Sequence, residues 1–349
     1  MRILKALALP FLLSLTASVL AQALANGAAA GCARCHAAQT LKQPETPMGR
    51  ALLTGANPTL QANPKLSVRK GTFTYTVETH GEASTYSVTD GVRTLSLPIR
   101  WTFGVGAQTW ILERDGRLYE SLVSYYPSIH GLDTTTGDES LKPGTLEEAM
   151  GRELKPGDSR DCFGCHASHS VTDGKLNLAA LQPGVNCEHC HVGSSTHLVD
   201  ALQGVMDSAP PDLRKLGPED IASFCGQCHR TWETVVRNRW RGEANVRFQP
   251  YRLANSRCYS GTDPRIGCLA CHDPHQDLVQ QDSSYDAKCL ACHGSASGSA
   301  VSTRVAKTCP VAKENCVQCH MPKVTLPGGL MTFTDHQIRV VRKGEVYPN

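Results

Sequence analysis

Residues 71–126 alternate between apolar and polar positions with the period of two that a half-buried β-strand shows. Phe73, Tyr75 and Val77, for instance, are separated by single polar residues. The pattern predicts an antiparallel sheet of four or five strands. The segments that we expect to form these strands are 72–77, 84–88, 95–103, 109–112 and 118–126.

Turn signals separate the predicted strands. Asp90-Gly91 and Asp115-Gly116 each predict a tight turn, because glycine readily adopts the positive φ that such turns require. Pro98 has no amide hydrogen to donate, so its strand is expected at a sheet edge or at a bulge. We expect the sheet either to cover the neighbouring domain or to dock a partner protein.

The rest of the chain predicts little regular structure. Helical patterns occur at 145–152 and 218–231, and Pro218 stands near the start of the second. Most other residues beyond 131 lie in stretches rich in Gly and Pro, which favour turns. Aromatic residues make up only 6% of the 349 residues, so a bound group is expected to fill part of the interior.

The first 25 residues have the pattern of a secretory signal peptide. Arg2 and Lys5 precede an apolar stretch over 6–20, and small residues follow at Ala23 and Ala25. We expect cleavage near Asn26, with an uncleaved membrane anchor as the alternative. The mature protein is then expected in the periplasm or at the cell exterior.

The motif Cys-x-x-Cys-His occurs seven times. Two cysteines three positions apart on a helical turn can bond the two vinyl groups of one porphyrin, and the following histidine then faces the iron. Zinc sites and thioredoxin-like sites also use Cys-x-x-Cys, but neither requires that histidine. The spacing predicts seven covalently bound haem c groups. In chain order, the attachment cysteines and proximal histidines are motif 1 (Cys32, Cys35, His36), motif 2 (Cys162, Cys165, His166), motif 3 (Cys187, Cys190, His191), motif 4 (Cys225, Cys228, His229), motif 5 (Cys268, Cys271, His272), motif 6 (Cys289, Cys292, His293) and motif 7 (Cys316, Cys319, His320).

Two cysteines lie outside the motifs. Cys258 and Cys309 each stand a short distance before a motif. In an oxidising compartment we favour a disulfide between them, with two buried thiols as the alternative.

Seven histidines remain besides the proximal ones, enough for a second imidazole on every iron. An iron with two imidazoles has no open position for a substrate, which suits electron transfer. His169 and His275 follow their own proximal histidine by three residues, so we expect each to reach a neighbouring haem. His336 has Asp335 or a backbone carbonyl available to orient its ring. We expect distal ligands at His169, His197, His275 and His336, regard His80 and His130 as further distal candidates, and expect His189, inside motif 3, not to bind iron.

Residues 161–341 resemble the multihaem cytochromes of the cytochrome c554 and pentahaem nitrite reductase lineage, which includes exported relatives of hydroxylamine oxidoreductase. The segments that carry the resemblance are 184–197, 268–275 and 334–339. The resemblance implies parallel and perpendicular haem stacking, with His197, His275 and His336 as distal ligands. The nitrite reductases have lysine as the proximal ligand of their catalytic haem, whereas all seven motifs here end in histidine.

These observations predict a mainly α, loop-rich cytochrome fold packed around haems, with an inserted antiparallel β-sheet subdomain. The expected boundaries are a signal peptide at 1–25, an N-terminal segment with the first motif at 26–66, the β subdomain at 67–130 and a six-haem domain at 131–349.

The expected function is electron transfer between redox protein partners, among them a membrane-associated quinol-linked donor. The alternative is a multihaem oxidoreductase with one open haem that acts on a small nitrogen or sulfur compound. Formal net charge is +3 for the precursor, and removal of Arg2 and Lys5 with the signal peptide leaves +1. Seven ferric haems with their propionates, each with a net charge of about −1, then lower the mature protein to about −6. Nothing in the sequence indicates nucleic-acid binding.

Overall fold

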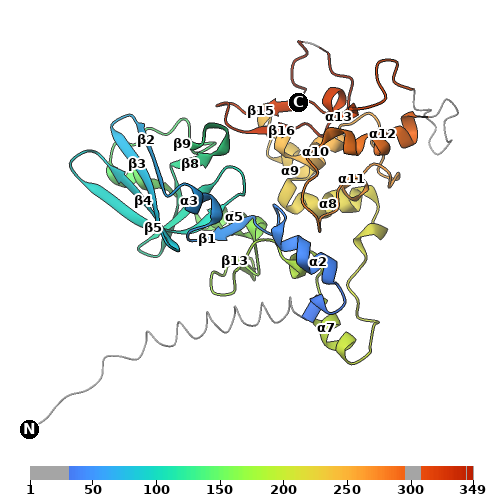
Figure 1. The fold of residues 1–349 in the computed structure, drawn as a ribbon, viewed down its shortest axis with the longest axis horizontal. Coiled ribbons are helices and arrows are strands. Elements are labelled where there is room, and N and C mark those ends of the chain that lie inside the picture. Colours follow the sequence, from blue (N-terminus) through green and yellow to red (C-terminus); the bar gives the residue numbers. More distant parts are fainter. Residues whose placement is uncertain (1–30, 295–307, 343, 349) are drawn as a thin grey trace, which may run out of the picture.

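The computed structural model describes residues 31–294, 308–342 and 344–348. A β-sheet lobe and a helical lobe lie side by side (Figure 1). The described chain starts in the helical lobe, enters the sheet lobe at β1 and returns to the helices through α5. The sheet is therefore inserted between the first motif and the other six.

The largest element is an eight-stranded antiparallel sheet in the order β10-β7-β6-β5-β4-β3-β2, with β1 also paired to β5. Two-stranded sheets join β8 with β9, β11 with β14, β12 with β13 and β15 with β16. The strands are β1 (Leu52–Thr54), β2 (Lys65–Lys70), β3 (Phe73–His80), β4 (Ala83–Thr89), β5 (Thr94–Phe103), β6 (Thr109–Arg114), β7 (Arg117–Ser121), β8 (Val123–Tyr126), β9 (Gly131–Thr134), β10 (Gly151–Glu153), β11 (Ala167–Ser168), β12 (Val171–Thr172), β13 (Lys175–Leu176), β14 (Gln182–Pro183), β15 (Lys323–Thr325) and β16 (Thr332–Thr334).

The five predicted strands are confirmed, but the sheet is larger than four or five strands. Strands β1, β2 and β10 lie outside the alternating window, and two of them are only three residues long, too short to show a period. The segment predicted at 118–126 divides at Leu122 into β7 and β8. The Asp115-Gly116 turn has φ of 53° and 72°, the left-handed pair that joins twisted strands closely.

A β-bulge in β5 changes which face its side chains occupy. Pro98 pairs with Thr85 inside the sheet, so the expectation of an edge strand is wrong. The expected bulge is confirmed, and it lies just after Pro98, between Ile99 and Trp101. Ile99 pairs with Leu112 and Trp101 with Ile111, which leaves Arg100 as the extra residue. Residues two apart normally share a face, but the extra residue places Ile99 and Trp101 in different core clusters.

The first core cluster fills one face of the sheet. Phe73, Tyr75 and Val77 of β3 are buried there together with Trp110 of β6, whose side chain is fully enclosed. Helix α4 (Leu146–Met150) closes this core with its apolar side chains. Its start is fixed by a capping box, in which Thr145 and Glu148 bond each other's backbone amides.

The helices of the described residues are short, and the prediction of a mainly α fold is wrong. The eight-stranded sheet is the dominant element, and only α5 and α8 exceed nine residues. A Cys-x-x-Cys-His motif needs only one helical turn to align its sulfurs, so nothing in these motifs requires a long helix. The helices besides α4 are α2 (Ala37–Lys42), α3 (Pro58–Ala62), α5 (Pro156–His166), α6 (Cys187–Cys190), α7 (Ser194–Leu202), α8 (Pro218–His229), α9 (Trp232–Arg237), α10 (Gln249–Ala254), α11 (Cys268–Cys271), α12 (Asp286–His293) and α13 (Cys316–His320).

The two predicted helices are present. Helix α8 matches the expectation at 218–231, and Pro218 is its first residue. Helix α4 covers only part of 145–152, because residues from Gly151 onward join the sheet as β10. Among the described residues, no helix combines the length and hydropathy needed to cross a bilayer. The predicted signal peptide lies outside the described residues.

Candidate haem sites

Motifs 2 to 7 each place their two cysteines on one helical turn. Motifs 3, 5 and 7 form α6, α11 and α13, and motifs 2, 4 and 6 end α5, α8 and α12. The amide of the proximal histidine donates to the carbonyl of the first cysteine, as in His36 to Cys32 at 2.8 Å, His191 to Cys187 at 2.8 Å and His272 to Cys268 at 2.9 Å. This turn brings both sulfurs to the same side, as the spacing predicts.

Two proximal histidines face a histidine from elsewhere in the chain. The rings of His191 and His275 are nearly parallel, with centroids 6.0 Å apart. The rings of His272 and His336 have centroids 6.2 Å apart. An imidazole nitrogen binds a transition metal at about 2 Å, so two rings on opposite sides of one ion have centroids about 6 Å apart. Both pairs therefore have the separation of two axial ligands.

Hydrogen bonds set which ring nitrogen is free to bind a metal. Nδ1 of His166, His320 and His336 lies 2.9, 2.8 and 3.0 Å from the carbonyls of Ala51, Arg339 and Thr334, respectively. A carbonyl only accepts, so Nδ1 is the donor in each case and Nε2 keeps its lone pair. His275 does the same through Nδ1 and the Asp273 carboxylate at 3.1 Å. A hydrogen bond from the nitrogen that does not bind the metal is typical of histidine ligands.

His336 is held by a buried ion pair next to it. Asp335 and Arg252 are both fully buried and form two hydrogen bonds of 2.8 and 2.9 Å. Burial alone would raise the pKa of Asp335, but hydrogen bonds from Arg252 and the Gln337 amide outweigh it and lower the pKa below the usual range. Burial lowers the pKa of His336 to about 4, so its ring is neutral near pH 7 and able to bind a metal. Of the two orienting groups expected for this ring, the structure uses the backbone carbonyl of Thr334.

Motif 2 is packed against the second face of the sheet. Phe163 of α5 is fully buried, with its ring 5.3 Å from that of Trp101 and 5.1 Å from that of Phe103. The Phe103 ring also lies 4.7 Å from the His166 ring. These contacts belong to a second core cluster that includes Leu52 and Ile111. The sheet therefore positions motif 2 directly.

His169 and His189 line a cavity of about 270 Å³ between motifs 2 and 3. Nε2 of His169 lies 2.7 Å from a carboxylate oxygen of Glu188, so this nitrogen is engaged in a hydrogen bond. His169 also has φ of 54°, uncommon for a residue other than glycine. Burial and the nearby His169 lower the pKa of His189. The ligand role of His169 stays a prediction.

The other distal candidates lie in different surroundings. His197 is on α7, and its neighbour Leu198 lies against Gly31, next to motif 1. Nδ1 of His197 is buried without a hydrogen-bond partner among the described residues. His80 ends β3 on the surface of the sheet lobe. His130 is exposed, with φ of 47°, in the turn before β9. Only His197 of these three lies beside a motif in the described contacts.

Cys258 and Cys309 are both free thiols, so the favoured disulfide is absent from the structure. Cys258 lies instead near Cys271, Cys289 and Cys292 of motifs 5 and 6, where burial raises the pKa of its thiol. The cysteines near Cys258 are therefore those of motifs 5 and 6, and Cys309 is not among them.

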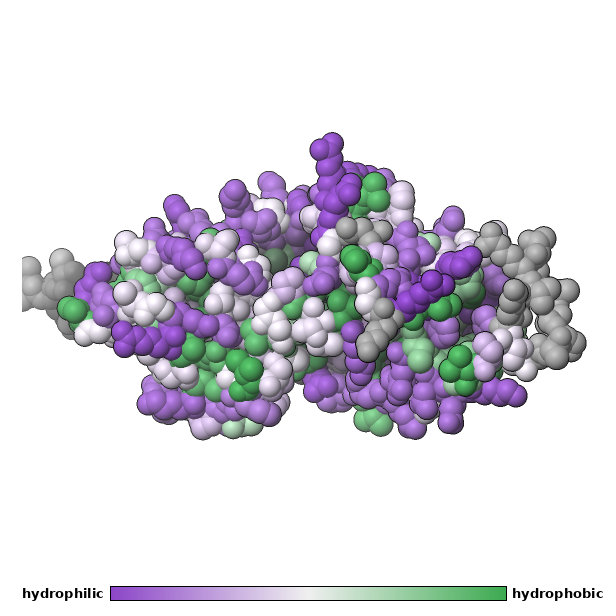
Figure 2. All heavy atoms as spheres, turned by 90° about the horizontal axis from the view of Figure 1, so that it is seen from above, coloured by the Kyte–Doolittle hydropathy of each residue, from purple (hydrophilic) through white to green (hydrophobic). Residues whose placement is uncertain are grey.

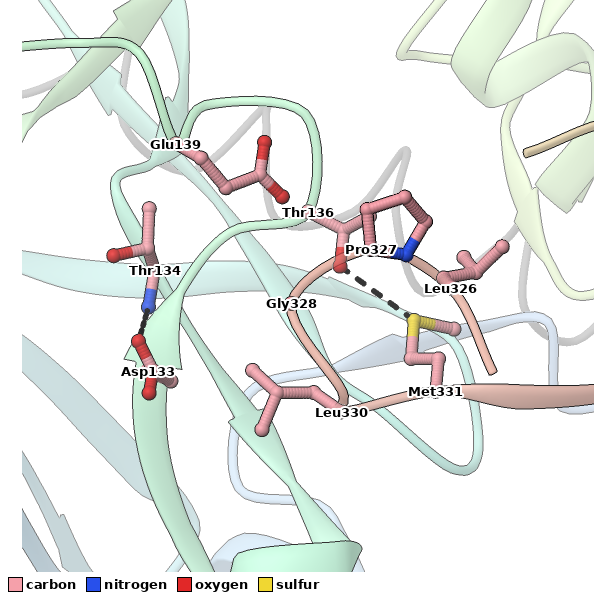
Figure 3. A pocket seen from close by; sticks show the side chains of 9 residues that line it. All are labelled: Asp133, Thr134, Thr136, Glu139, Leu326, Pro327, Gly328, Leu330 and Met331. Atoms are coloured by element: carbon pink, nitrogen blue, oxygen red, sulfur yellow. Dashed lines mark hydrogen bonds between the residues drawn. The ribbon is translucent and has the colours of Figure 1, made fainter. Parts of the chain in front are cut away.

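Another cavity, of about 100 Å³, lies between β9 and the loop that joins β15 to β16 (Figure 3). Its lining includes the carboxylates of Asp133 and Glu139 and the thioether of Met331, to which the Thr136 hydroxyl donates at 3.7 Å. It contains no histidine or cysteine. This cavity lies where the two lobes meet, and its lining lacks the cysteines and histidines of a haem site.

Side chains beside the motifs fit a porphyrin. The visible face of the molecule is mostly hydrophilic, with small apolar areas (Figure 2). Several large apolar residues are nevertheless exposed close to a motif, such as Val192 at 74% directly after His191 and Trp232 at 50% just after His229. Apolar surface of this kind is what the faces of a porphyrin cover. Together with paired cysteines and free imidazole nitrogens, these residues supply the donors and surface that haem c needs.

Comparison with known proteins agrees with this donor set. Residues 128–192, which include motifs 2 and 3, match the family model of cytochrome c554 and c-prime. A solved structure titled as the outer cell wall cytochrome OcwA superposes with a TM-score of 0.51 at 13% identity, over 89% of this chain and 79% of that one. Over residues 128–192 the chain is thus similar to a family of c-type cytochromes, and its fold is similar to that of OcwA. No curated protein matches this chain.

Sequence reasoning missed the residues that support the candidate ligands. The Arg252–Asp335 pair and the Phe163 cluster come from segments 83 and about 60 residues apart, which no local pattern connects. The one available signal was Asp335 beside His336, which indicated an ordered ring but not the arginine partner.

Proposed function

We propose that this protein is an exported electron carrier that binds seven haems, one at each motif, and passes electrons between redox protein partners. When bound, haem c supplies a one-electron couple at its iron. Residues of the chain supply the rest. Paired cysteines attach the group, imidazoles bind its iron, and neighbouring motifs keep the groups close together.

The observation that carries the proposal is the pair of facing rings, His191 with His275 and His272 with His336. With haem bound, the two rings of a pair would hold the iron from opposite sides. Such a site excludes substrates and changes little in geometry when its charge changes, so it favours electron transfer over catalysis. In each pair the partner comes from a different part of the chain, so each site also joins separate segments.

Mass spectrometry of the mature protein tests the haem count and the export. We expect a polypeptide that starts near Asn26 and carries seven haem groups. Carbon monoxide tests the function: the dithionite-reduced protein should show no carbon monoxide shift, because every iron has two protein ligands. A mass without haem, or with zinc or cystine in its place, would contradict the proposal.

The second candidate is an oxidoreductase with one open iron that acts on a small nitrogen or sulfur compound. The hydrogen bond between His169 and Glu188 favours it, because it withholds a predicted distal ligand. A carbon monoxide shift on one haem in seven would support this candidate over a carrier with every iron closed.

A further inference from the structure

We infer that motif 4 is the junction of a branched haem array, at which three arms that begin with motifs 2, 3 and 5 meet. The inference rests on the proposed seven haems. It concerns the order in which the motifs lie against one another, which differs from their order in the sequence. The thiols are the informative atoms, because each thioether bond joins a sulfur to the edge of its porphyrin, and porphyrin edges set the distances that electrons tunnel.

Motif 2 meets motif 4 through helices α5 and α8, which pack against each other. The Cys165 sulfur lies 3.9 Å from the carbonyl oxygen of Gln227, a residue inside motif 4. The thiols of Cys165 and Cys228 are within hydrogen-bond reach of each other. The cysteines of motifs 2 and 4 thus lie side by side.

Motif 5 meets motif 4 in the same way. Helices α8 and α11 are in contact, and the thiols of Cys225 and Cys268 are within hydrogen-bond reach. Motif 3 supplies the third neighbour, since Cys190 lies close enough to both Cys225 and Cys228 to influence them by its charge. Each cysteine of motif 4 therefore faces the thiol of another motif.

The remaining motifs extend these arms. Cys32 of motif 1 lies near Cys187 of motif 3. Cys271 of motif 5 lies near Cys289 of motif 6, and Cys289 is within hydrogen-bond reach of Cys316 of motif 7. The thiol contacts of the described residues thus give one arm from motif 3 to motif 1, one from motif 5 through motif 6 to motif 7, and a short arm that consists of motif 2 alone.

Motif 2 also approaches motif 3, through the hydrogen bond between His169 and Glu188. No attachment thiol takes part in that contact. We therefore assign motif 2 to motif 4, and the short arm ends beneath the sheet, where Phe163 and Trp101 pack.

A crystal structure of the holoprotein, with the irons located by anomalous scattering, tests the order. We expect the porphyrins of motifs 2, 3 and 5 each to approach the motif 4 porphyrin edge to edge, and the motif 2 porphyrin to have motif 4 as its nearest neighbour. A motif 2 porphyrin nearest to any other, or seven haems in sequence order, would overturn the junction. Fewer than seven irons would contradict the proposed function, and the junction as well if motif 4 carries none.

A pair of ligand variants tests the same order in solution. Methionine in place of a histidine ligand raises the potential of its own haem, which then takes up its electron earlier in a reductive titration. The charge of that electron shifts the midpoint potentials of the adjacent haems. In a spectroscopic redox titration we expect His229→Met to shift the midpoint potentials of three other haems and the control His320→Met, at the end of an arm, to shift one. Both variants must keep seven haems by mass. A His229→Met effect confined to one other haem would overturn the junction.

Discussion

The imidazole rings of His191 and His275 lie nearly parallel with centroids 6.0 Å apart, although motifs 4 and 5 separate them in the sequence. Under the proposed function, His275 beside motif 5 completes the site of motif 3. A segment that holds one of the proposed haems would then be unable to move without disturbing a second.

Substitution of His275 by alanine should open one iron. We expect the reduced His275→Ala protein to bind carbon monoxide at a single haem, because the ring facing His191 is removed. The measurement is the difference spectrum with and without carbon monoxide. His189→Ala is the matched control, since His189 lies inside motif 3 and is predicted not to bind iron. No carbon monoxide shift in His275→Ala, or an equal shift in the control, would contradict the assignment.

Breaking the buried pair should destabilise the protein strongly. Arg252→Met leaves the Asp335 carboxylate buried without its bidentate partner, at an expected cost of about 3–5 kcal/mol in the free energy of unfolding. The exposed pair of Arg237 with Glu233 provides the comparison, and Arg237→Met should cost less than about 1 kcal/mol. Thermal or denaturant unfolding of the holoprotein measures both. Similar losses in the two variants would show that burial of the pair is not important.

The same carboxylate predicts an acid dependence. The pKa of Asp335 is lower in the folded protein than in the unfolded chain. Its contribution to stability is therefore fully present above the unfolded pKa of about 3.9 and is lost as the pH falls below that value. We expect the wild-type melting temperature to fall between pH 4 and pH 2 more steeply than that of Asp335→Asn, which has no carboxylate to titrate. Parallel curves would contradict this.

Removal of the Phe163 ring should affect both the sheet and motif 2. Phe163→Ala is expected to cost about 3–5 kcal/mol, as for other fully buried aromatic residues. It should also change the spectrum or potential of one haem, because Phe163 and His166 share the neighbour Phe103. Trp110→Ala, in the first core cluster, is the control and should destabilise the protein without that haem signature. An identical haem response in both variants would show that the sheet does not position motif 2 through Phe163.

The sequence predicted the helical turn of the motifs and the sheet strands well, because both depend on neighbours along the chain. The spacing of Cys268, Cys271 and His272 defines a helical turn by itself, and the alternation around Tyr75 defines a strand. The balance of helix and sheet was predicted wrongly, because short edge strands such as β10 exist only through pairing with a strand elsewhere. The contacts between motifs depend on residues far apart, such as Cys165 and Gln227, which no periodicity relates.

The extra residue at Arg100 has a consequence for how the sheet lobe depends on the helical lobe. Because it turns Trp101 away from the side that Ile99 occupies, both faces of the sheet carry buried apolar side chains, and the second face is covered by the helix that ends in His166. Displacement of this helix would expose the second face to water. A change that loosens α5 should therefore leave the β lobe open to proteases, even where the first core cluster stays intact.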